Sequence, residues 1–157
     1  MAKKKEKKTI EIINRKAEYQ YHFVDTIEAG IVLKGTEIKS IRGGAINLRD
    51  AFCVFKKGEL FIRNLYIKEY DFGNFFNHEA RRTRKLLLKK GELKKWEKKV
   101  KERGYTIIPF RMYLSERGFA KVEIVLAQGK KSYDKRNSIK QKDQKRDLDR
   151  IKKSYRI

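Results

Sequence analysis

The composition of this chain changes abruptly at residues 129–136, which read Gly-Lys-Lys-Ser-Tyr-Asp-Lys-Arg. Before this stretch, apolar and polar residues alternate as they do in β-strands, so these residues can build a packed interior. From Asn137 to Ile157, Lys, Arg, Asp and Gln dominate, and too few apolar residues remain to form a core. We therefore expect a flexible basic arm at 1–8, a folded body at 9–130 and a basic tail at 131–157.

The charge of the chain indicates the kind of partner. Its 157 residues include 42 Lys and Arg against 20 Asp and Glu, which gives a formal net charge of +22. A positive field of this size is typical of proteins that bind polyanions, and nucleic acid is the first candidate. No apolar run approaches the roughly 20 residues of a membrane-spanning helix, so we expect a cytoplasmic protein without a membrane partner. The single Cys53 lies in an apolar run and is expected to be a buried thiol.

The body has the pattern of short antiparallel strands. A long strand is predicted at 21–33, where Gly30 would allow a bulge or a bend. A hairpin is predicted at 51–67, around a polar loop that contains Gly. Two more strands are predicted within 105–128, and Pro109 marks its strand as an edge or a bulge. We expect a mainly β protein, with a small antiparallel oligonucleotide-binding barrel and flanking helices.

Two helices are expected between the strands. The first covers about 36–42, with Thr36 as its N-terminal cap and Gly43 at its end. The second covers 80–103, is strongly basic, and is expected to be divided at Gly91. The tail, if helical, would extend about 40 Å at about 1.5 Å per residue. Because it has little apolar surface, we predict that it is disordered until RNA neutralises its charge.

Groups for catalysis are few. The two histidines and the cysteine show no metal-binding spacing, so we expect no metal and no cofactor. A metal-dependent nuclease remains an alternative, because carboxylates can hold a divalent ion. The candidates for that alternative are Asp25, Glu28, Glu37 and Asp50. They fall in different predicted elements without diagnostic spacing, so we expect that the protein is not an enzyme.

Several motifs, taken together and in order, resemble those of the small protein B family, the SsrA-binding proteins. The motifs are Asn14-Arg15-Lys16-Ala17, the run from Glu28 to Ser40, Asn77-His78, Arg84-Lys85-Leu86-Leu87-Leu88, Lys121-Val122-Glu123-Ile124, and Gly129-Lys130-Lys131 through Asp134-Lys135-Arg136. The resemblance runs from about residue 10 to the C-terminus. Three positions depart from the family pattern, namely Tyr19, Ala45 and Ala80.

The resemblance implies an RNA-binding adaptor. Proteins of this family bind the tRNA-like domain of transfer-messenger RNA and accompany it to ribosomes stalled on messages without a stop codon. There the protein stands in for the missing anticodon arm, and its tail occupies the decoding site and the empty message channel. We expect the same partners for this chain, as a monomer without a cofactor. A generic oligonucleotide-binding or ribosomal protein is the alternative, but it leaves the motif at 134–136 and the long tail unexplained.

The resemblance and the charge pattern together predict the site residues. Cationic side chains would contact phosphates, an exposed Leu87 would pack on a base or ribose, and Glu28 would meet base donors. The predicted RNA-binding residues are Asn14, Arg15, Lys16, Tyr19, Glu28, Lys34, Arg81, Arg84, Lys85 and Leu87. The predicted ribosome-contacting residues of the tail are Lys130, Lys131, Asp134, Lys135, Arg136, Arg150, Ile151 and Lys152.

Overall fold

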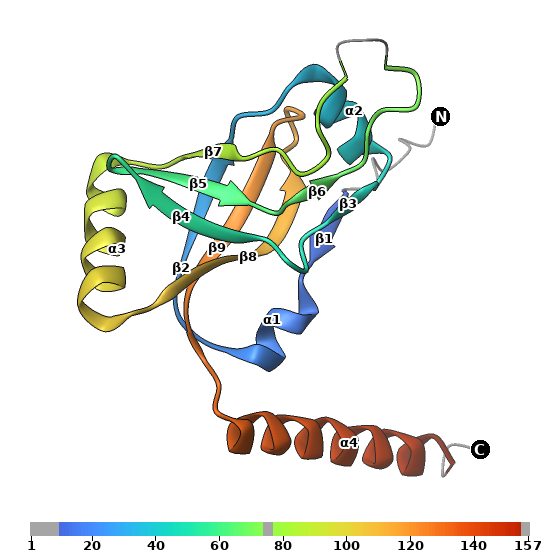
Figure 1. Cartoon of the computed structure of the whole chain (residues 1–157). Coiled ribbons are helices and arrows are strands. Elements are labelled where there is room, and N and C mark those ends of the chain that lie inside the picture. The colour runs from blue at the N-terminus through green and yellow to red at the C-terminus, as the bar shows by residue number, and fades with distance from the viewer. Residues whose placement is uncertain (1–9, 74–76, 155–157) are drawn as a thin grey trace.

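The computed structural model of the chain describes residues 10–73 and 77–154. The predicted arm at 1–8 lies outside these described residues. The strands are β1 (Glu11–Ile13), β2 (Tyr21–Ile31), β3 (Ile46–Asn47), β4 (Phe52–Lys56), β5 (Glu59–Arg63), β6 (Tyr66–Ile67), β7 (Arg84–Leu87), β8 (Thr106–Leu114) and β9 (Ala120–Gly129). The helices are α1 (Arg15–Gln20), α2 (Gly35–Arg42), α3 (Lys90–Arg103) and α4 (Ser132–Ser154). Figure 1 shows their arrangement.

Seven strands form one antiparallel sheet in the order β1-β8-β4-β5-β7-β2-β9. Strand β8 also pairs with β9, so the sheet closes on itself as a barrel, while β3 and β6 form a separate small sheet. Figure 1 shows α2 and α3 at different ends of this barrel. The predicted mainly β barrel with flanking helices is confirmed. A closed sheet satisfies the backbone groups that open edges would leave unpaired.

The long strands bend at bulges. In β8 the register shifts between Pro109 and Arg111. Of the two expectations for Pro109, an edge strand or a bulge, the bulge is confirmed. In β2 the register shifts between Phe23 and Asp25, so the bulge of this strand lies there and not at Gly30, where a bulge or a bend was expected. The register of β2 against both β7 and β9 runs through Gly30.

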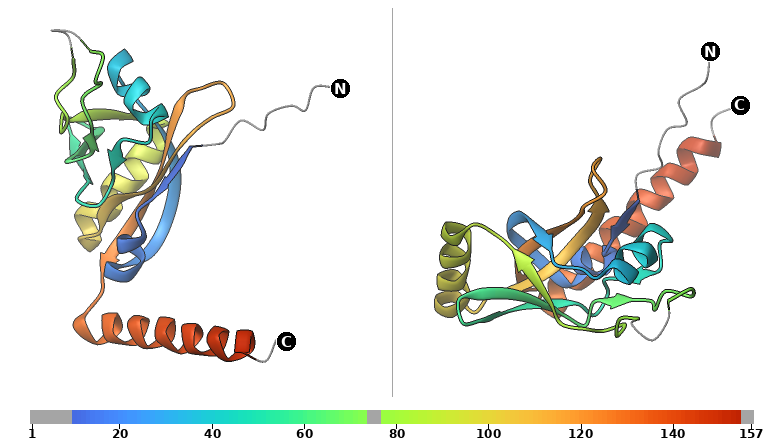
Figure 2. Two further views of the ribbon diagram at one scale, coloured as in Figure 1. Left: turned by 90° about the vertical axis from the view of Figure 1, so that its right-hand side faces the viewer. Right: turned by 90° about the horizontal axis from the view of Figure 1, so that it is seen from above.

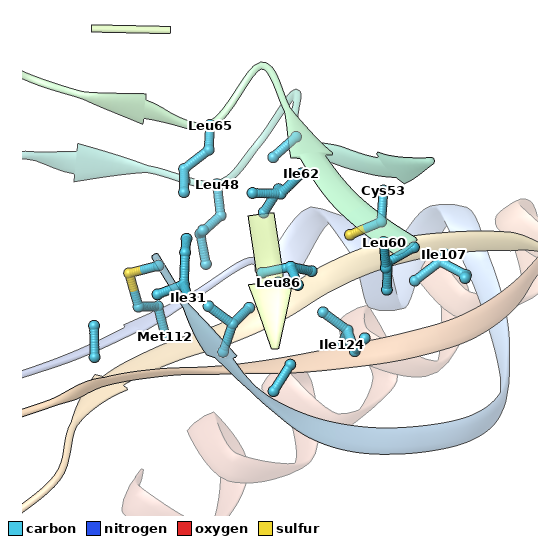
Figure 3. Close-up of a cluster of buried hydrophobic side chains, with 14 of the residues drawn as sticks. Ile31, Leu48, Cys53, Leu60, Ile62, Leu65, Leu86, Ile107, Met112 and Ile124 are labelled. Atoms are coloured by element: carbon cyan, nitrogen blue, oxygen red, sulfur yellow. The ribbon is translucent and has the colours of Figure 1, made fainter. Parts of the chain in front are cut away.

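The barrel interior is filled by alternate residues of the strands. Figure 3 shows Leu60, Ile62, Leu86, Met112 and Ile124 pointing into one cluster, and each is at most 2% exposed. Because strand side chains point alternately to opposite faces, their sequence neighbours point outward. Burial of these aliphatic groups is the main source of stability for such a barrel.

Cys53 belongs to the same cluster and is 7% exposed. Its position on β4 is paired with Ile62 on β5 and with Ile107 on β8. Burial raises the pKa of its thiol, so the thiol stays protonated. The prediction that Cys53 is a buried thiol is confirmed.

The hairpin predicted at 51–67 is confirmed as β4 and β5, with a tighter turn than expected, but its second strand ends at Arg63, and Tyr66–Ile67 form β6, which pairs with β3. Lys56 pairs with Glu59, so the turn consists of Lys57 and Gly58. Both turn residues have positive φ, at 51° and 75°. This backbone conformation matches the twist of the two strands.

The helix predicted at 80–103 is wrong in its first half. Residues 84–87 form β7, which pairs with β5 on one side and β2 on the other. Helix α3 begins at Lys90, so Gly91 lies in its first turn and does not divide it. Long-range pairing on both edges of β7 outweighs the local helix preference of its leucines. Gly104 ends α3 with a φ of 66°, and helices commonly end at a glycine in this left-handed conformation.

Helix α2 is confirmed, but Thr36 is not its cap. Lys34 holds the cap position, and its backbone N–H donates to Glu37 Oε1 at 2.9 Å. The hydroxyl of Thr36 is instead 2.9 Å from Nδ1 of His78. Gly43 lies at the C-terminal cap, as expected.

The tail differs from its prediction, because residues 132–154 form α4 where disorder was expected. The tail contains no Gly or Pro after Gly129, and it is rich in Lys, Arg and Gln, which favour helix. Asp143, Asp147 and Asp149 each have a Lys or Arg three or four residues away, a spacing that stabilises exposed helices. Figure 2 shows α4 projecting from the barrel on the side of α1. In the described part of the chain, no helix is both long and apolar enough to cross a membrane.

Candidate nucleic-acid interface

Five strands present one continuous exposed surface, which we call the outer sheet face. Its position follows from the register, because Val122, Ile124 and Met112 are fully buried and their neighbours therefore point outward. Glu123 of β9 is paired with Glu28 of β2 and with Arg111 of β8. The outer sheet face consists of Glu11, Glu28, Leu87, Arg111, Tyr113, Lys121 and Glu123.

Leu87 lies over Gly30, and the two residues are paired between β7 and β2. A Cβ atom placed on Gly30 would lie 3.3 Å from the Cβ of Leu87. The missing side chain therefore lets Leu87 lie close to the backbone of β2. Leu87 remains 52% exposed, so an apolar contact surface is left open to a partner.

Glu28 and Tyr113 meet across the outer sheet face. The hydroxyl of Tyr113 donates to Oε2 of Glu28, and this hydrogen bond raises the pKa of Tyr113 to about 12. Arg111 lies over the ring of Tyr113 at 4.6 Å from its centroid. The guanidinium also binds Oε1 of Glu11 at 2.7 Å and Oε2 of Glu123 at 3.0 Å. The predicted residue Glu28 is therefore exposed but held in place.

Asn14 is 5% exposed, although it was predicted to bind RNA. Its amide nitrogen donates to the carbonyl oxygens of Leu48 and Pro109, each at 3.3 Å. These bonds tie the start of α1 to the barrel, so Arg15 and Lys16, which follow, are exposed at a fixed position. Asn14, Arg15 and Lys16 line a hollow of about 430 Å³. In the structure Asn14 thus connects α1 to the barrel, with the cations beside it at the surface.

Arg84 is fully buried, which corrects the prediction that it contacts phosphate. Its Nε donates to Oε2 of Glu37, which is also fully buried. The remaining guanidinium donors bind the backbone oxygens of Leu65, Glu79, Ala80 and Arg82. All five N–H donors of this side chain therefore have partners inside the protein. Arg84 lies in the basic run at 81–85, so the sequence gave no sign of this burial.

The other predicted cations lie at or near the surface. Lys34 and Arg81 are exposed, and the guanidinium of Arg81 lies 5.5 Å from the ring centroid of Tyr66. Lys85 is half-exposed and binds Oε1 of Glu59 at 2.8 Å. Lys85 lies on the same strand as Leu87, and all three cations can approach a polyanion.

Tyr19 lies apart from Leu87, on α1. It is half-buried and lines a hollow of about 290 Å³ together with Glu18 and three residues of α4. Those three residues are Gln141, Lys142 and Lys145. The ring of Tyr19 is therefore at the contact between α1 and the tail helix.

The predicted tail residues begin where β9 ends. The backbone N–H of Lys130 donates to the carbonyl of Gln20 at 2.8 Å, which ties the start of the tail to α1. Lys135 and Arg136 lie in the first turns of α4, whereas Arg150, Ile151 and Lys152 lie near its other end. The side chain of Asp134 lies outside the described residues.

The carboxylates of the nuclease alternative are not brought together. Asp25 accepts a hydrogen bond from the indole of Trp96 at 3.1 Å, and Glu37 is paired with arginines. Glu28 is bound to Tyr113, and Asp50 is exposed at the surface. Within residues 10–73 and 77–154, no group of three or more His, Cys, Asp or Glu is placed to hold a metal ion.

Sequence reasoning missed Arg111 and Tyr113 as part of this surface. The signal was present, because buried Met112 between them places both on the outside of β8. The contact of Tyr113 with Glu28 depends on the pairing of three strands, which no local pattern contains.

Comparison with known proteins identifies the family. The chain is 55% identical to the SsrA-binding protein of Flavobacterium johnsoniae over 148 residues, which are 94% of this chain and 98% of that protein. It is 52% identical to the SsrA-binding protein of Desulforamulus reducens over 137 residues, which are 87% of this chain and 85% of that protein.

A solved structure is also similar. It is described as "tmRNA-SmpB: a journey to the center of the bacterial ribosome", and one of its chains matches with a TM-score of 0.68 and 44% sequence identity. The match covers 83% of this chain and 94% of that chain. The sequence model of the SmpB protein family matches residues 11–154. The chain therefore belongs to the SmpB protein family.

Proposed function

We propose that this chain is an RNA-binding adaptor of trans-translation. Its body binds the tRNA-like domain of transfer-messenger RNA, and the complex acts on stalled ribosomes in the cytoplasm. Support comes from relatives that are named SsrA-binding proteins and from the similar chain in a structure described as tmRNA-SmpB. The protein works as a monomer without a cofactor and catalyses no reaction of its own.

One observation in the structure carries the RNA-binding part of this proposal. Glu28 and Leu87 come from distant parts of the sequence, and the pairing of Gly30 with Leu87 places them on the same exposed face. Folded RNA is recognised by contacts to phosphates, riboses and unstacked bases, and these contacts need cations, apolar side chains and hydrogen-bonding groups together. The outer sheet face supplies the apolar side chain of Leu87 and the hydrogen-bonding carboxylate of Glu28, and the cations lie on it and in the loops beside it.

The tail is the part that meets the ribosome in this proposal. Helix α4 has 23 residues and is therefore about 35 Å long at about 1.5 Å per residue. It projects from the barrel, so it can enter a channel while the body stays bound to its RNA (Figure 2). The basic residues Lys130, Lys131, Lys135 and Arg136 then contact the decoding site, and 150–152 lie deeper in the message channel.

The test is a reconstituted translation reaction on a message without a stop codon. With transfer-messenger RNA and the intact chain, we expect the stalled nascent chain to receive the tag. A chain truncated after Lys131 should bind the RNA but give no tagged product. A Lys135→Glu, Arg136→Glu chain should behave like the truncated one. Tagging at the full rate without this protein, or with the truncated chain, would contradict the proposed function.

A further inference from the structure

The outer sheet face carries negative charges that a purely phosphate-binding surface would not need. On a chain of net charge +22, this face carries three carboxylates: Glu11 and Glu123 bind the guanidinium of Arg111, and Glu28 is paired with Glu123 on the neighbouring strand. A carboxylate repels phosphate, but it accepts hydrogen bonds from N–H groups of bases. The face is therefore suited to read a base edge.

Arg111 neutralises two of these carboxylates and not the third. It binds Glu11 at 2.7 Å and Glu123 at 3.0 Å. Among the residues that the structure describes, no Lys or Arg forms an ion pair with Glu28. Glu28 also faces Glu123 directly between β2 and β9, and like charges at paired positions repel each other. Glu28 is thus an exposed carboxylate whose charge no described cation neutralises, so it can accept hydrogen bonds from a partner.

Tyr113 is the residue that fixes the orientation of Glu28. Its ring is held under the guanidinium of Arg111, and its hydroxyl donates to Oε2 of Glu28. A carboxylate has about four lone-pair sites, so one bond from Tyr113 leaves acceptors on both oxygens. Because the side chain of Glu28 is already fixed, binding loses less conformational entropy than it would with a mobile side chain.

The neighbours of Glu28 match the other parts of a nucleotide. Leu87 lies over Gly30, two residues along β2, and offers an apolar surface to a ribose or a base. Lys121 is paired with both Gly30 and Tyr113, so an ammonium group that can contact phosphate lies on the same face. An acceptor, an apolar side chain and a cation are therefore grouped within a few strand positions.

We propose that Tyr113 is a positioning residue, which holds Glu28 so that its carboxylate reads the edge of an unpaired guanine in the bound RNA. Guanine presents two adjacent N–H donors, N1–H and N2–H₂, on its base-pairing edge, and a carboxylate can accept two parallel bonds. This inference rests on the proposed function, since the guanine belongs to the tRNA-like domain of transfer-messenger RNA. It adds a residue of β8 and a base identity to that function.

The test measures binding of the full chain at one salt concentration to two RNAs. One is the acceptor and D-arm fragment of transfer-messenger RNA, and the other is a single-stranded RNA of equal length. The variants are Tyr113→Phe, Glu28→Gln and the double variant, with Tyr105→Phe as the control. The hydroxyl of Tyr105 makes no hydrogen bond to any described residue. A second series replaces each unpaired guanine of the fragment by inosine, which lacks the N2 amino group.

We expect Tyr113→Phe to weaken binding of the structured fragment about tenfold, since a hydrogen bond to a charged group is lost. Binding of the single strand should not change, and neither should the salt dependence, because the phosphate contacts remain. The double variant should bind no more weakly than Glu28→Gln, because both changes remove one interaction. One inosine substitution should weaken the wild type about tenfold and leave Glu28→Gln unaffected.

Four results would overturn the inference. Three are an unchanged affinity of Tyr113→Phe, additive losses in the double variant, and a wild type that tolerates every inosine. The fourth is an equal loss for both RNAs with a lowered melting temperature, which would give Tyr113 a merely structural role. A wild type that binds both RNAs equally would instead contradict the proposed function itself.

Discussion

The guanidinium of Arg84 donates to the carboxylate of Glu37 in the protein interior, where neither side chain is exposed to solvent. This pair joins β7 to α2, and Arg82 binds the other carboxylate oxygen of Glu37. The strand that carries Leu87 is therefore fixed to helix α2. A charge predicted to contact RNA instead holds in place the strand that carries Leu87.

Removing one partner of this pair should strongly destabilise the fold. We expect Glu37→Gln or Arg84→Ala to lower the free energy of unfolding by about 3–5 kcal/mol, because a buried charge loses its partner. Urea unfolding of the free protein measures this change. The control is Lys85→Ala, which breaks a half-exposed pair with Glu59 and should cost less than about 1 kcal/mol. Equal costs for the buried and the half-exposed pair would be incompatible with the assigned roles.

The same pair should make stability depend on pH in the acid range. Burial alone raises the pKa of Glu37, but hydrogen bonds from Arg82, the backbone of Lys34 and Arg84 outweigh it, so the pKa is below its ordinary value of 4.5. A depressed pKa in the folded state stabilises the fold above the unfolded pKa, and this stability is lost as the pH falls through the folded value.

The free energy of unfolding, measured from about pH 7 to about pH 3, should therefore fall more steeply for the wild type than for Glu37→Gln. The difference in free energy of unfolding between the wild type and Glu37→Gln should become smaller below a pH of about 4.5. Parallel curves over this range would show that Glu37 does not titrate with a depressed pKa.

Gly30→Ala should weaken RNA binding more than it weakens the fold. The new Cβ would lie 3.3 Å from the Cβ of Leu87, so Leu87 must shift outward by a few tenths of an ångström. Since Leu87 is 52% exposed, it can move at a cost to stability of less than about 1 kcal/mol. We expect the Kd for the structured fragment to rise about three- to tenfold, in line with 0.7–1.4 kcal/mol.

The matched control for Gly30 is Gly129→Ala. Gly129 also lies in a strand, and a Cβ at that position would meet nothing within 4 Å. Binding and unfolding should both match the wild type. If Gly129→Ala weakened binding as much as Gly30→Ala, the closeness of Leu87 to β2 would not be the cause.

Truncation after Lys131 should remove helix without weakening the barrel. Helix α4 has 23 residues and is the longest helix in the described part of the chain. Among the other helices, its contacts are with α1, so the core clusters lose nothing. We expect the far-ultraviolet circular dichroism signal of helix to fall by close to half, with a melting temperature within about 2 °C of the intact chain. An unchanged helical signal would mean that the tail is not helical in solution.

The sequence predicted the barrel but not all of its strands. The hairpin of β4 and β5 was predictable because a turn with Gly58 lies between two β-prone runs, all within a few residues. Strand β7 was not, because Arg84–Leu87 is a short run without a clear period and becomes a strand through pairing with distant β5 and β2. Helix α4 was missed because the prediction relied on its low apolar content, which indicated disorder. The helix preference of its residues and the spacing of its charges, which favour a helix, were not considered.

For the candidate site, the sequence predicted residue types better than their roles. Glu28 and Leu87 were predicted and lie exposed on one face. Asn14 and Arg84 were predicted as contacts and are buried, because burial of a polar side chain depends on partners that are far away in the sequence. Tyr113 was missed because its hydrogen bond to Glu28 joins β8 to β2 across β9, and these residues are far apart in the sequence.

The most direct test of the proposed function is a binding titration at one fixed salt concentration. It compares the acceptor and D-arm fragment of transfer-messenger RNA with a single-stranded RNA of equal length, for the intact chain and for the chain truncated after Lys131. We predict a strong preference for the structured fragment that truncation leaves unchanged, because the proposal assigns RNA binding to the outer sheet face and ribosome contact to α4. Equal affinity for both RNAs, with a sharp loss on truncation, would contradict this account and favour a generic basic RNA-binding protein.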